Sequence, residues 1–252
     1  DIDKLKFSEM AILVGGLGTR LSSVISDVPK PMAPVNSIPF LHYVILYWAN
    51  QGVKNFYLLS GFKSEIIENY FCNKFNHINV QVEKEEELLG TGGAINSFLK
   101  KNKIFNKSEF LAILNGDTWL SINRNKLNKK LSSLSNEVLV VCRKIENNDR
   151  YGTLKLKKDK IFDICKPNLA KATINAGLYI GQISLWEEIF SNYKPNQNFS
   201  FESRIMPELA RNGFLTGTTC VKNFLDIGVP YDYKKTNLLL KKELDRTNYF
   251  LS

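Results

Sequence analysis

A glycine-rich loop that follows a short apolar segment constrains this chain more than any other feature. The stretch, from Ala11 to Pro34, reads AILVGGLGTRLSSVISDVPKPMAP. Its first four residues are typical of a buried strand, and glycine at three of the next four positions lets the backbone turn tightly where that strand ends. Loop amides without a strand partner, together with Arg20 and Lys30, place N–H donors and positive charge around a small anion. The stretch therefore predicts a site that handles a polyphosphate.

The spacing of the glycines separates this loop from two common phosphate-binding loops. A dinucleotide fingerprint needs G-x-G-x-x-G, but the third position after Gly16 and Gly18 is Leu21. A Walker A loop needs G-x-x-x-x-G-K followed by Ser or Thr, which is absent here. What is left is G-G-x-G-T-R-L and then P-K-P-M at Pro29 to Met32. An ordinary glycine-rich turn beside two unrelated cations is the structural alternative.

Length and charge narrow the class of protein. The 252 residues allow one large α/β domain or two small ones. The formal net charge is +9, which suits anionic partners. However, the lysines are scattered along the chain and are not interleaved with aromatic residues as an RNA-binding face would be. A lysine-rich solvated surface is favoured, and we predict no nucleic-acid partner.

Hydropathy and cysteine usage predict a cytoplasmic protein without membrane contact. No apolar run reaches the length that a bilayer requires, and residues 1–10 are charged, without the apolar region of a secretory signal. The four cysteines are widely spaced and form no C-x-x-C pair, which argues against a zinc site or a disulfide scaffold. The two histidines, His42 and His77, are isolated in the sequence and each is interpreted as structural, which argues against a Ser-His-Asp mechanism.

Hydrophobic periodicity predicts alternating helices and strands in the first part of the chain. The expected helices cover 40–51, 64–75 and 93–99, and Ser64 is the expected N-cap of the second. The expected strands cover 55–60, 80–82, 110–114 and 138–143. This order predicts an α/β fold with a mixed but mostly parallel, Rossmann-like sheet and helices on both faces. Ligands of such sheets bind at the carboxyl ends of the strands, where the glycine loop falls.

The second part of the chain changes character. An antiparallel hairpin is expected over 152–156 and 160–164, which marks a small antiparallel subregion on the substrate side. Further expected elements are strands at 173–180, 215–221 and 224–227, and helices at 184–190, 200–211 and 230–244. No linker or internal repeat interrupts the pattern, so we predict a single domain over residues 1–252.

Six short motifs follow the first two in order along the chain. They are LGTGGAI at 89–95, NGD at 115–117, KP at 166–167, NAG at 175–177, FE at 201–202 and DIG at 226–228. Several have plain structural alternatives, namely a helix N-terminus, a turn-forming Asp and a bulge around Gly177. Taken with GGLGTRL and PKPM, they resemble the signature of the sugar-1-phosphate nucleotidyltransferases, also named sugar nucleotide pyrophosphorylases. The resemblance spans about Met10 to Asp232 and implies the nucleotidyltransferase type of α/β fold.

The resemblance implies a role for each matching residue. Arg20 and Lys30 are the implied catalytic residues, and Asp117 and Asp226 are the implied ligands of one Mg²⁺. The implied nucleotide-binding residues are Leu13, Gly15, Gly16, Gly18, Thr19, Glu85, Gly90, Thr91 and Gly116. The implied sugar-phosphate-binding residues are Asn115, Lys166, Asn175, Gly177 and Glu202. Cys165 departs from the family, which usually has Glu at this position beside one edge of the sugar.

The implied reaction joins a nucleoside triphosphate and a sugar 1-phosphate and releases pyrophosphate. Positioning and charge neutralisation are the main tasks of the protein in such a transfer. We expect a nucleotide-binding half at about 10–145, a sugar-phosphate-binding half at about 146–232 and a C-terminal helix at 233–252. The number of subunits is left open, with a homo-oligomer among the alternatives.

The nucleobase and the sugar are the least constrained part of this interpretation. Residues 83–87 read EKEEE, and such acceptors favour the N–H donors of guanine, although a surface acidic run gives the same pattern. Within the family, LGTGGAI in a compact chain is most similar to the D-glycero-D-manno-heptose 1-phosphate guanylyltransferases, which serve surface polysaccharides. We expect GTP with that heptose 1-phosphate. Mannose 1-phosphate, or glucose 1-phosphate with UTP or dTTP, are the alternatives.

Two other classes of protein compete with this interpretation. A glycosyltransferase of similar build would carry a D-x-D metal motif, whereas this chain reads Asp117-Thr118-Trp119. A non-catalytic sugar nucleotide sensor would be expected to lose a metal carboxylate or the loop cation, yet Asp226 and Lys30 are both present. Clustered charges of this kind are costly to hold together and usually indicate function.

Overall fold

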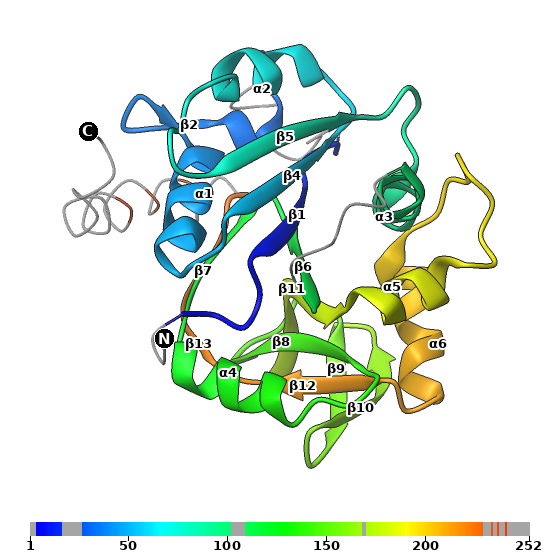
Figure 1. Cartoon of the computed structure of the whole chain (residues 1–252). Helices are drawn as coiled ribbons and strands as arrows, with labels where there is room; N and C mark the ends of the chain where they lie inside the picture. The colour runs from blue at the N-terminus through cyan, green and yellow to red at the C-terminus, as the bar shows by residue number, and fades with distance from the viewer. Residues whose placement is uncertain are drawn as a thin grey trace.

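A nine-stranded mixed sheet with helices on both faces forms the centre of the molecule (Figure 1). The structure is a computed structural model that describes residues 4–16, 27–101, 109–167 and 170–228, together with Tyr233, Thr236 and Leu240. The strand order is β5-β4-β1-β6-β11-β8-β12-β10-β9. The predicted α/β fold with a mixed sheet is confirmed.

Four strands at one side of the sheet run parallel. They are β5 (Asn79–Lys84), β4 (Asn55–Ser60), β1 (Glu9–Leu13) and β6 (Phe110–Asn115). The register places Leu13, at the end of β1, beside Leu59 of β4 and Asn115 of β6. Because these strands run in the same direction, their carboxyl ends meet at one edge, which is where α/β sheets bind ligands.

Antiparallel pairing dominates the rest of the sheet. The strands there are β11 (Ala172–Gln182), β8 (Val138–Ile145), β12 (Leu215–Thr218), β10 (Lys160–Cys165) and β9 (Thr153–Lys157). β11 runs antiparallel to both β6 and β8, and β12 is parallel to β8. β9 and β10 form the predicted antiparallel hairpin. Parallel pairing thus covers only part of the sheet, because β11 inserts between β6 and β8 in the opposite direction.

Two small sheets complete the strands. β7 (Thr118–Ile122) pairs antiparallel with β13 (Val221–Asp226), with Asp226 opposite Thr118. β2 (Pro34–Val35) pairs with β3 (Ile38–Pro39) just after the short 3₁₀ helix η1 (Lys30–Met32). The sequence analysis predicted no strand at β7. Its residues, TWLSI, are all buried and show no polar-apolar alternation from which a half-buried strand is recognised.

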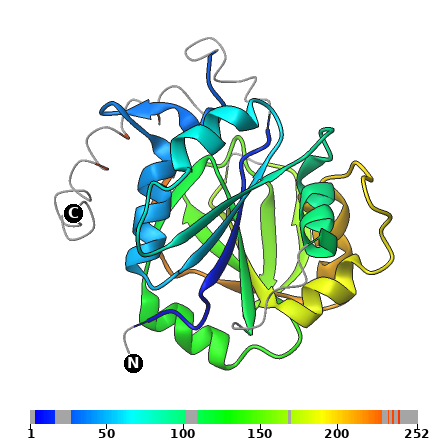
Figure 2. The ribbon, with the colours of Figure 1, turned by 45° about the horizontal axis from the view of Figure 1, so that its top comes forward.

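The helices divide between the two faces of the sheet (Figure 2). α1 (Phe40–Asn50), α2 (Ser64–Phe71) and α4 (Arg124–Ser132) pack on the face that includes Met10 and Ile12 of β1. α3 (Gly90–Lys101), α5 (Ile183–Phe190) and α6 (Met206–Arg211) pack on the opposite face, which includes Ala11. Successive residues of β1 therefore belong to two different cores, as the pleat of a strand requires.

Several predicted helix boundaries are wrong. Ser64 is not the N-cap of α2; the capping position is Lys63, in left-handed backbone, and α2 ends at Phe71 because Cys72 is extended. The single helix expected over 200–211 is a π-helical turn, η2 (Phe201–Ile205), followed by α6. Pro207 lacks the N–H that a regular helix would use at this junction, which accounts for the change of pitch.

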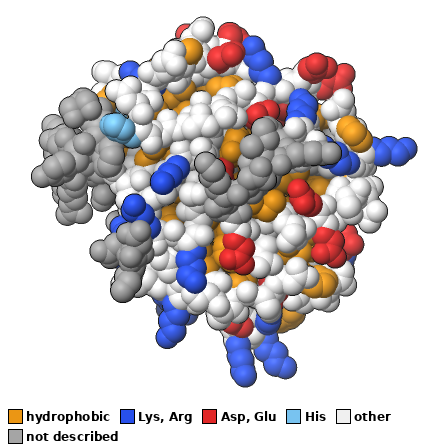
Figure 3. All heavy atoms as spheres, in the orientation of Figure 1, with side chains coloured by type: hydrophobic (Ala, Val, Ile, Leu, Met, Phe, Trp, Pro, Cys, Tyr) orange, Lys and Arg blue, Asp and Glu red, His pale blue; other side chains and the backbone are white. Residues whose placement is uncertain are grey.

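Two further expectations concern the ends of the chain and its surface. The helix expected over 230–244 lies outside the described residues apart from Tyr233, Thr236 and Leu240. Figure 3 shows Lys and Arg side chains spread over the visible face, with Asp and Glu among them. Across the described ranges, no helix has both the length and the apolar character needed to cross a bilayer.

His42 makes the stability of the fold depend on pH. This buried side chain of α1 contacts the Tyr70 hydroxyl through Nδ1 at 3.1 Å and packs against the Phe75 ring at 5.2 Å. Burial, with a smaller contribution from Lys74, lowers the pKa of His42 from 6.5 to about 4. In the unfolded chain His42 therefore becomes protonated below about pH 6.5, whereas in the folded chain it stays neutral down to about pH 4. The stabilising effect of neutral His42 is lost as the pH falls through this window.

We expect His42 alone to lower the free energy of unfolding by roughly 1.5 kcal/mol between pH 6.5 and 5. Urea unfolding at both pH values measures this change. In His42→Asn the pH dependence should be shallower by that amount, whereas His77→Asn, at an exposed position, should retain the wild-type slope. An unchanged slope in His42→Asn would show that another group titrates.

Candidate active site

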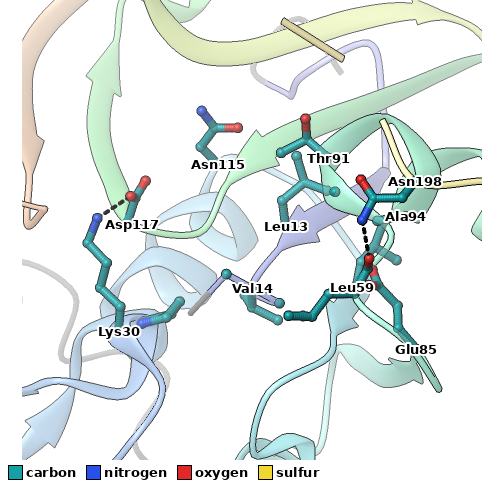
Figure 4. A pocket seen from close by; sticks show the side chains of 15 residues that line it. Leu13, Val14, Lys30, Leu59, Glu85, Thr91, Ala94, Asn115, Asp117 and Asn198 are labelled. Carbon is teal, nitrogen blue, oxygen red and sulfur yellow. Dashed lines mark hydrogen bonds and ion pairs between the residues drawn. The ribbon is translucent and has the colours of Figure 1, made fainter. Parts of the chain in front are cut away.

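A cavity of about 510 Å³ opens at the carboxyl ends of β1, β4 and β6 (Figure 4). Figure 4 shows Lys30 and Asp117 on one side of this cavity and Glu85 and Asn198 on the other. The predicted nucleotide-binding residues that line it are Leu13, Gly15, Gly16, Glu85, Gly90 and Thr91. Gly18, Thr19 and Arg20 lie outside the described residues.

Gly116 shapes this cavity from behind. Its N–H donates to the Leu13 carbonyl at 2.9 Å, which ties the end of β6 to the end of β1. A Cβ at position 116 would lie 2.6 Å from the Leu13 carbonyl oxygen and 2.7 Å from the Val14 side chain. Only glycine permits this approach, so the predicted residue supports the strand ends rather than lining the cavity.

Glu85 provides a carboxylate at the far end of the cavity. One of its oxygens accepts a hydrogen bond from the Leu89 N–H at 3.3 Å. Burial raises the pKa of Glu85, which the Leu89 N–H and the charge of Lys101 partly offset. Asn198 lies beside it and donates to the Leu88 carbonyl at 2.5 Å. This end of the cavity therefore presents hydrogen-bonding groups on an apolar background that includes Leu59 and Leu88.

A second cavity, of about 270 Å³, adjoins the first. Asn115 and Asp117 line both cavities. The smaller one also contains the predicted sugar-side residues Asn175, Gly177 and Glu202 and the predicted metal ligand Asp226. The side-chain oxygen of Asn115 is buried and accepts no hydrogen bond from the described residues. A buried polar atom without a partner is costly, so this oxygen is suited to accept a hydrogen bond from a bound hydroxyl.

The NAG motif lies at a bulge in β11. The register with β8 shifts between Asn175 and Leu178, so the structural alternative left open for this motif is correct. Gly177 has φ of 78°, and its N–H donates to the Asn175 side chain at 2.9 Å. The bulge directs Asn175 and Gly177 into the smaller cavity. A bulge and a site residue are therefore compatible at this position.

Two carboxylates and one ammonium group meet where the cavities join. Lys30 forms an ion pair with Asp117 (Figure 4). Asp226 accepts hydrogen bonds from the Tyr151 hydroxyl at 2.9 Å and from the Gly228 N–H at 2.7 Å. The Ile227 N–H donates to the Asp117 carbonyl at 3.0 Å, which holds the two Asp-bearing turns together. A Cβ at Gly228 would lie 2.5 Å from the Lys30 ammonium and 2.7 Å from Asp226.

These carboxylates fit a hard divalent cation. Mg²⁺ prefers oxygen ligands and is usually bound by one or two carboxylates together with substrate phosphates. In the part of the chain that the structure describes, no group of three or more His, Cys, Asp or Glu gathers into a metal cage. Asp117 and Asp226 supply two carboxylates on one cavity, which leaves the other positions to phosphate and water.

The structure also separates one predicted residue from the site and adds two. Lys166 follows β10, is exposed, and is not among the described residues that line either cavity. Tyr151 and Asn198 line the cavities, although the sequence analysis did not select them. Both lie in loops whose local sequence has no periodicity. Their contacts join positions 75 and 110 residues apart, so no local signal could have found them.

The arrangement defines a class of protein. A nucleotide-sized cavity at the ends of parallel strands adjoins a smaller polar cavity, and a lysine and two aspartates lie at their junction. Such a site is that of an α/β enzyme that brings two phosphate-bearing substrates together.

Comparison with known proteins identifies the family. The chain matches the Nucleotidyl transferase family over residues 10–243, and it belongs to that family. It is 35% identical to the D-glycero-alpha-D-manno-heptose 1-phosphate guanylyltransferase of Aneurinibacillus thermoaerophilus, over 90% of this chain and 96% of that protein. It is 38% identical to the enzyme of the same name from Campylobacter jejuni subsp. jejuni, over 88% and 95%. The resemblance inferred from the motifs is confirmed.

Solved structures show the same fold. The crystal structure of HddC from Yersinia pseudotuberculosis superposes with a TM-score of 0.76 and 32% identity, over 92% of this chain and 99% of that one. A second HddC structure, described as complexed with GMP-PN, superposes equally well at 31% identity.

Proposed function

We propose that the protein transfers the guanylyl group of GTP to D-glycero-α-D-manno-heptose 1-phosphate and releases pyrophosphate. The observation that carries this proposal is the pair of adjoining cavities that share Asn115 and Asp117. The larger cavity would take the nucleotide and the smaller one the sugar phosphate. The relatives from Aneurinibacillus thermoaerophilus and Campylobacter jejuni, which match nearly the full chain and carry the name of this activity, support the choice of sugar.

The choice of GTP has separate support. The structure of HddC complexed with GMP-PN is that of a relative which binds a guanine nucleotide. In this chain the Glu85 carboxylate lines the larger cavity at the end away from Lys30 and Asp117. A carboxylate there would accept hydrogen bonds from the two neighbouring N–H donors of guanine, whereas uracil and thymine present one N–H between two carbonyls. UTP or dTTP with glucose 1-phosphate, and GTP with mannose 1-phosphate, are the alternative substrates.

The chain's own residues would act mainly by placing charge. The sugar phosphate oxygen attacks the α-phosphorus of GTP in line with the departing pyrophosphate, which brings two anions together. Lys30 at the junction would stabilise the α-phosphate as negative charge develops there, and Arg20 would bind the leaving pyrophosphate. Asn115, Asn175, Gly177 and Glu202 would hold the sugar. Lys166 lines neither cavity, so it would contact the sugar phosphate only by reaching in with its exposed side chain from the end of β10.

Asp117 and Asp226 would hold one Mg²⁺, and Tyr151 would orient Asp226 through its hydrogen bond. When bound, the ion would supply positive charge that offsets the negative charge of the substrate phosphates. Within the single domain, residues of about 10–145 would form the nucleotide-binding half and residues of about 146–232 the sugar-phosphate-binding half. A cytoplasmic location and a homo-oligomeric state both stay predictions.

A pyrophosphate-release screen tests the proposed function. GTP, ATP, CTP, UTP and dTTP are each combined with heptose, mannose and glucose 1-phosphates in the presence of Mg²⁺. We expect release only when a sugar 1-phosphate is present, with kcat/KM at least about tenfold higher for GTP than for the other nucleotides. If UTP, dTTP or CTP exceeds GTP with every sugar, the guanylyl assignment is wrong. Release that is independent of any sugar phosphate would contradict the transfer reaction itself.

A further inference from the structure

The hydroxyl of Thr91 makes both of its protein contacts with the sugar side of the site. Thr91 lies in the first turn of α3 and lines the larger cavity. Its hydroxyl donates to the Glu202 carboxylate at 2.6 Å and accepts from the Phe201 N–H at 2.8 Å. A threonine hydroxyl has one proton to donate, and here that proton is committed to Glu202. Glu202 lines the smaller cavity, so one hydrogen bond joins the walls of the two cavities.

The glycines around Thr91 explain how the two segments come together. The Phe199 carbonyl accepts hydrogen bonds from the Gly92 and Gly93 N–H groups at 2.9 and 3.2 Å, and the Phe199 N–H donates to Leu89 at 2.9 Å. A Cβ at Gly90 would lie 2.7 Å from the Phe199 carbonyl oxygen, and one at Gly92 would overlap the Phe199 ring. The glycines of LGTGGAI thus admit the segment that precedes Glu202, in addition to opening the cavity.

Glu202 is held by several donors, of which Thr91 is the closest. The Ser200 hydroxyl contacts the same carboxylate oxygen at 3.1 Å, and the Tyr179 hydroxyl approaches the other oxygen at 3.4 Å. Tyr179 in turn accepts from the Asn175 side chain at 2.6 Å. Hydrogen bonds to a charged group are stronger than neutral ones, and the shortest contact restricts the carboxylate most. Loss of the Thr91 hydroxyl would therefore leave Glu202 held, among the described residues, only by the two longer contacts, from Ser200 and Tyr179.

We propose that Thr91 is a positioning residue for the sugar phosphate, which acts by fixing the Glu202 carboxylate. This inference rests on the proposed function and assigns to the sugar a residue that the sequence motif assigned to the nucleotide. The LGTGGAI segment at 89–95 would thereby form part of the sugar subsite as well as part of the nucleotide cavity. It follows that a substitution at Thr91 should weaken the binding of the sugar phosphate and leave that of GTP nearly unchanged.

The test compares Thr91→Val, which removes the hydroxyl at constant shape, with Thr91→Ser, which retains it. For Thr91→Val we expect a sugar 1-phosphate KM about 10- to 100-fold higher, as for the loss of a hydrogen bond to a charged group, with the GTP KM within about threefold. Thr91→Ser should recover most of the affinity. Thr219→Val, which removes a hydroxyl that accepts from the Lys126 ammonium at 3.4 Å on the surface, controls for the same chemical change outside the cavities.

Calorimetric titration with D-glycero-α-D-manno-heptose 1-phosphate gives a second readout that does not need turnover. Glu202→Ala removes the acceptor of the same hydrogen bond, and on that background Thr91→Val should have little further effect. An unchanged sugar affinity in Thr91→Val, or an equal loss for GTP and sugar, would overturn the proposal. An inactive wild-type protein that still binds the sugar phosphate would contradict the proposed function alone, because the binding comparison stands without catalysis.

Discussion

Asp117→Asn and Asp226→Asn are each expected to lower the turnover number by at least about a hundredfold. Each substitution removes one negative charge and keeps the shape of the side chain. The two carboxylates open on one cavity, and their turns are joined by the hydrogen bond from Ile227 to the Asp117 carbonyl. Loss of electrostatic stabilisation at a reacting centre costs about a hundredfold or more in rate. The measurement is pyrophosphate release at saturating GTP and sugar 1-phosphate over a range of Mg²⁺ concentrations.

The rate loss should be accompanied by weaker binding of the metal ion. Titration with Mn²⁺, followed by its electron paramagnetic resonance signal, reports the affinity without requiring turnover. Asp159→Asn is a matched control, because Asp159 lies in the turn between β9 and β10 and pairs with Lys130 on the surface. Near-normal turnover of both site variants in the presence of excess chelator would refute the metal assignment.

Lys30→Ala is expected to depress kcat by about a hundredfold while the GTP KM rises by less than about tenfold. Lys30 lies on η1 and forms its ion pair with Asp117 at the junction of the two cavities. A cation at this position would contact the α-phosphate most strongly as negative charge builds in the transition state. Interactions that strengthen in the transition state affect kcat more than binding of the ground state. Steady-state kinetics with both substrates varied measure the two effects separately.

The control for this variant is Lys171→Ala. Lys171 also pairs with a carboxylate, that of Glu146, but both side chains are about four-fifths exposed, so the loss of the pair should leave kcat unchanged. Calorimetry with GTP and Mg²⁺ completes the comparison. If Lys30→Ala binds GTP much more weakly but turns over normally at saturation, then Lys30 docks the nucleotide and has no catalytic role.

Regular elements with clear periodicity were predicted well from the sequence. The strand expected over 55–60 is β4, and the helix expected over 40–51 is α1, which ends one residue earlier. The hairpin of β9 and β10 was also predicted. In contrast, α4 was missed, because its only buried apolar residues, Leu127 and Leu131, give a weak pattern in a polar segment. Tertiary packing of those two residues stabilises a helix that local sequence barely indicates.

The order of strands in the sheet was beyond local analysis. Alternating strands and helices predict parallel pairing, yet β11 lies between β6 and β8 and runs antiparallel to both. The residues of β11 do not by themselves indicate which strands it pairs with or in which direction it runs in the sheet. Those depend on which placement buries both faces of the strand in the two cores, and this is decided by the whole chain.

The motifs in the sequence identified the family and selected residues such as Lys30, Asp117 and Asp226, because phosphate and metal chemistry demands those residue types at strand ends and glycine loops. Their individual roles are still predictions. The contact between Tyr151 and Asp226 is seen only in the tertiary structure. The same is true of the hydrogen bond from Thr91 to Glu202, which forms because Phe199 packs on the first turn of α3. The physical reason is range: spacing along the chain determines turns and strand ends, whereas contacts between positions about a hundred residues apart depend on strand register and core packing.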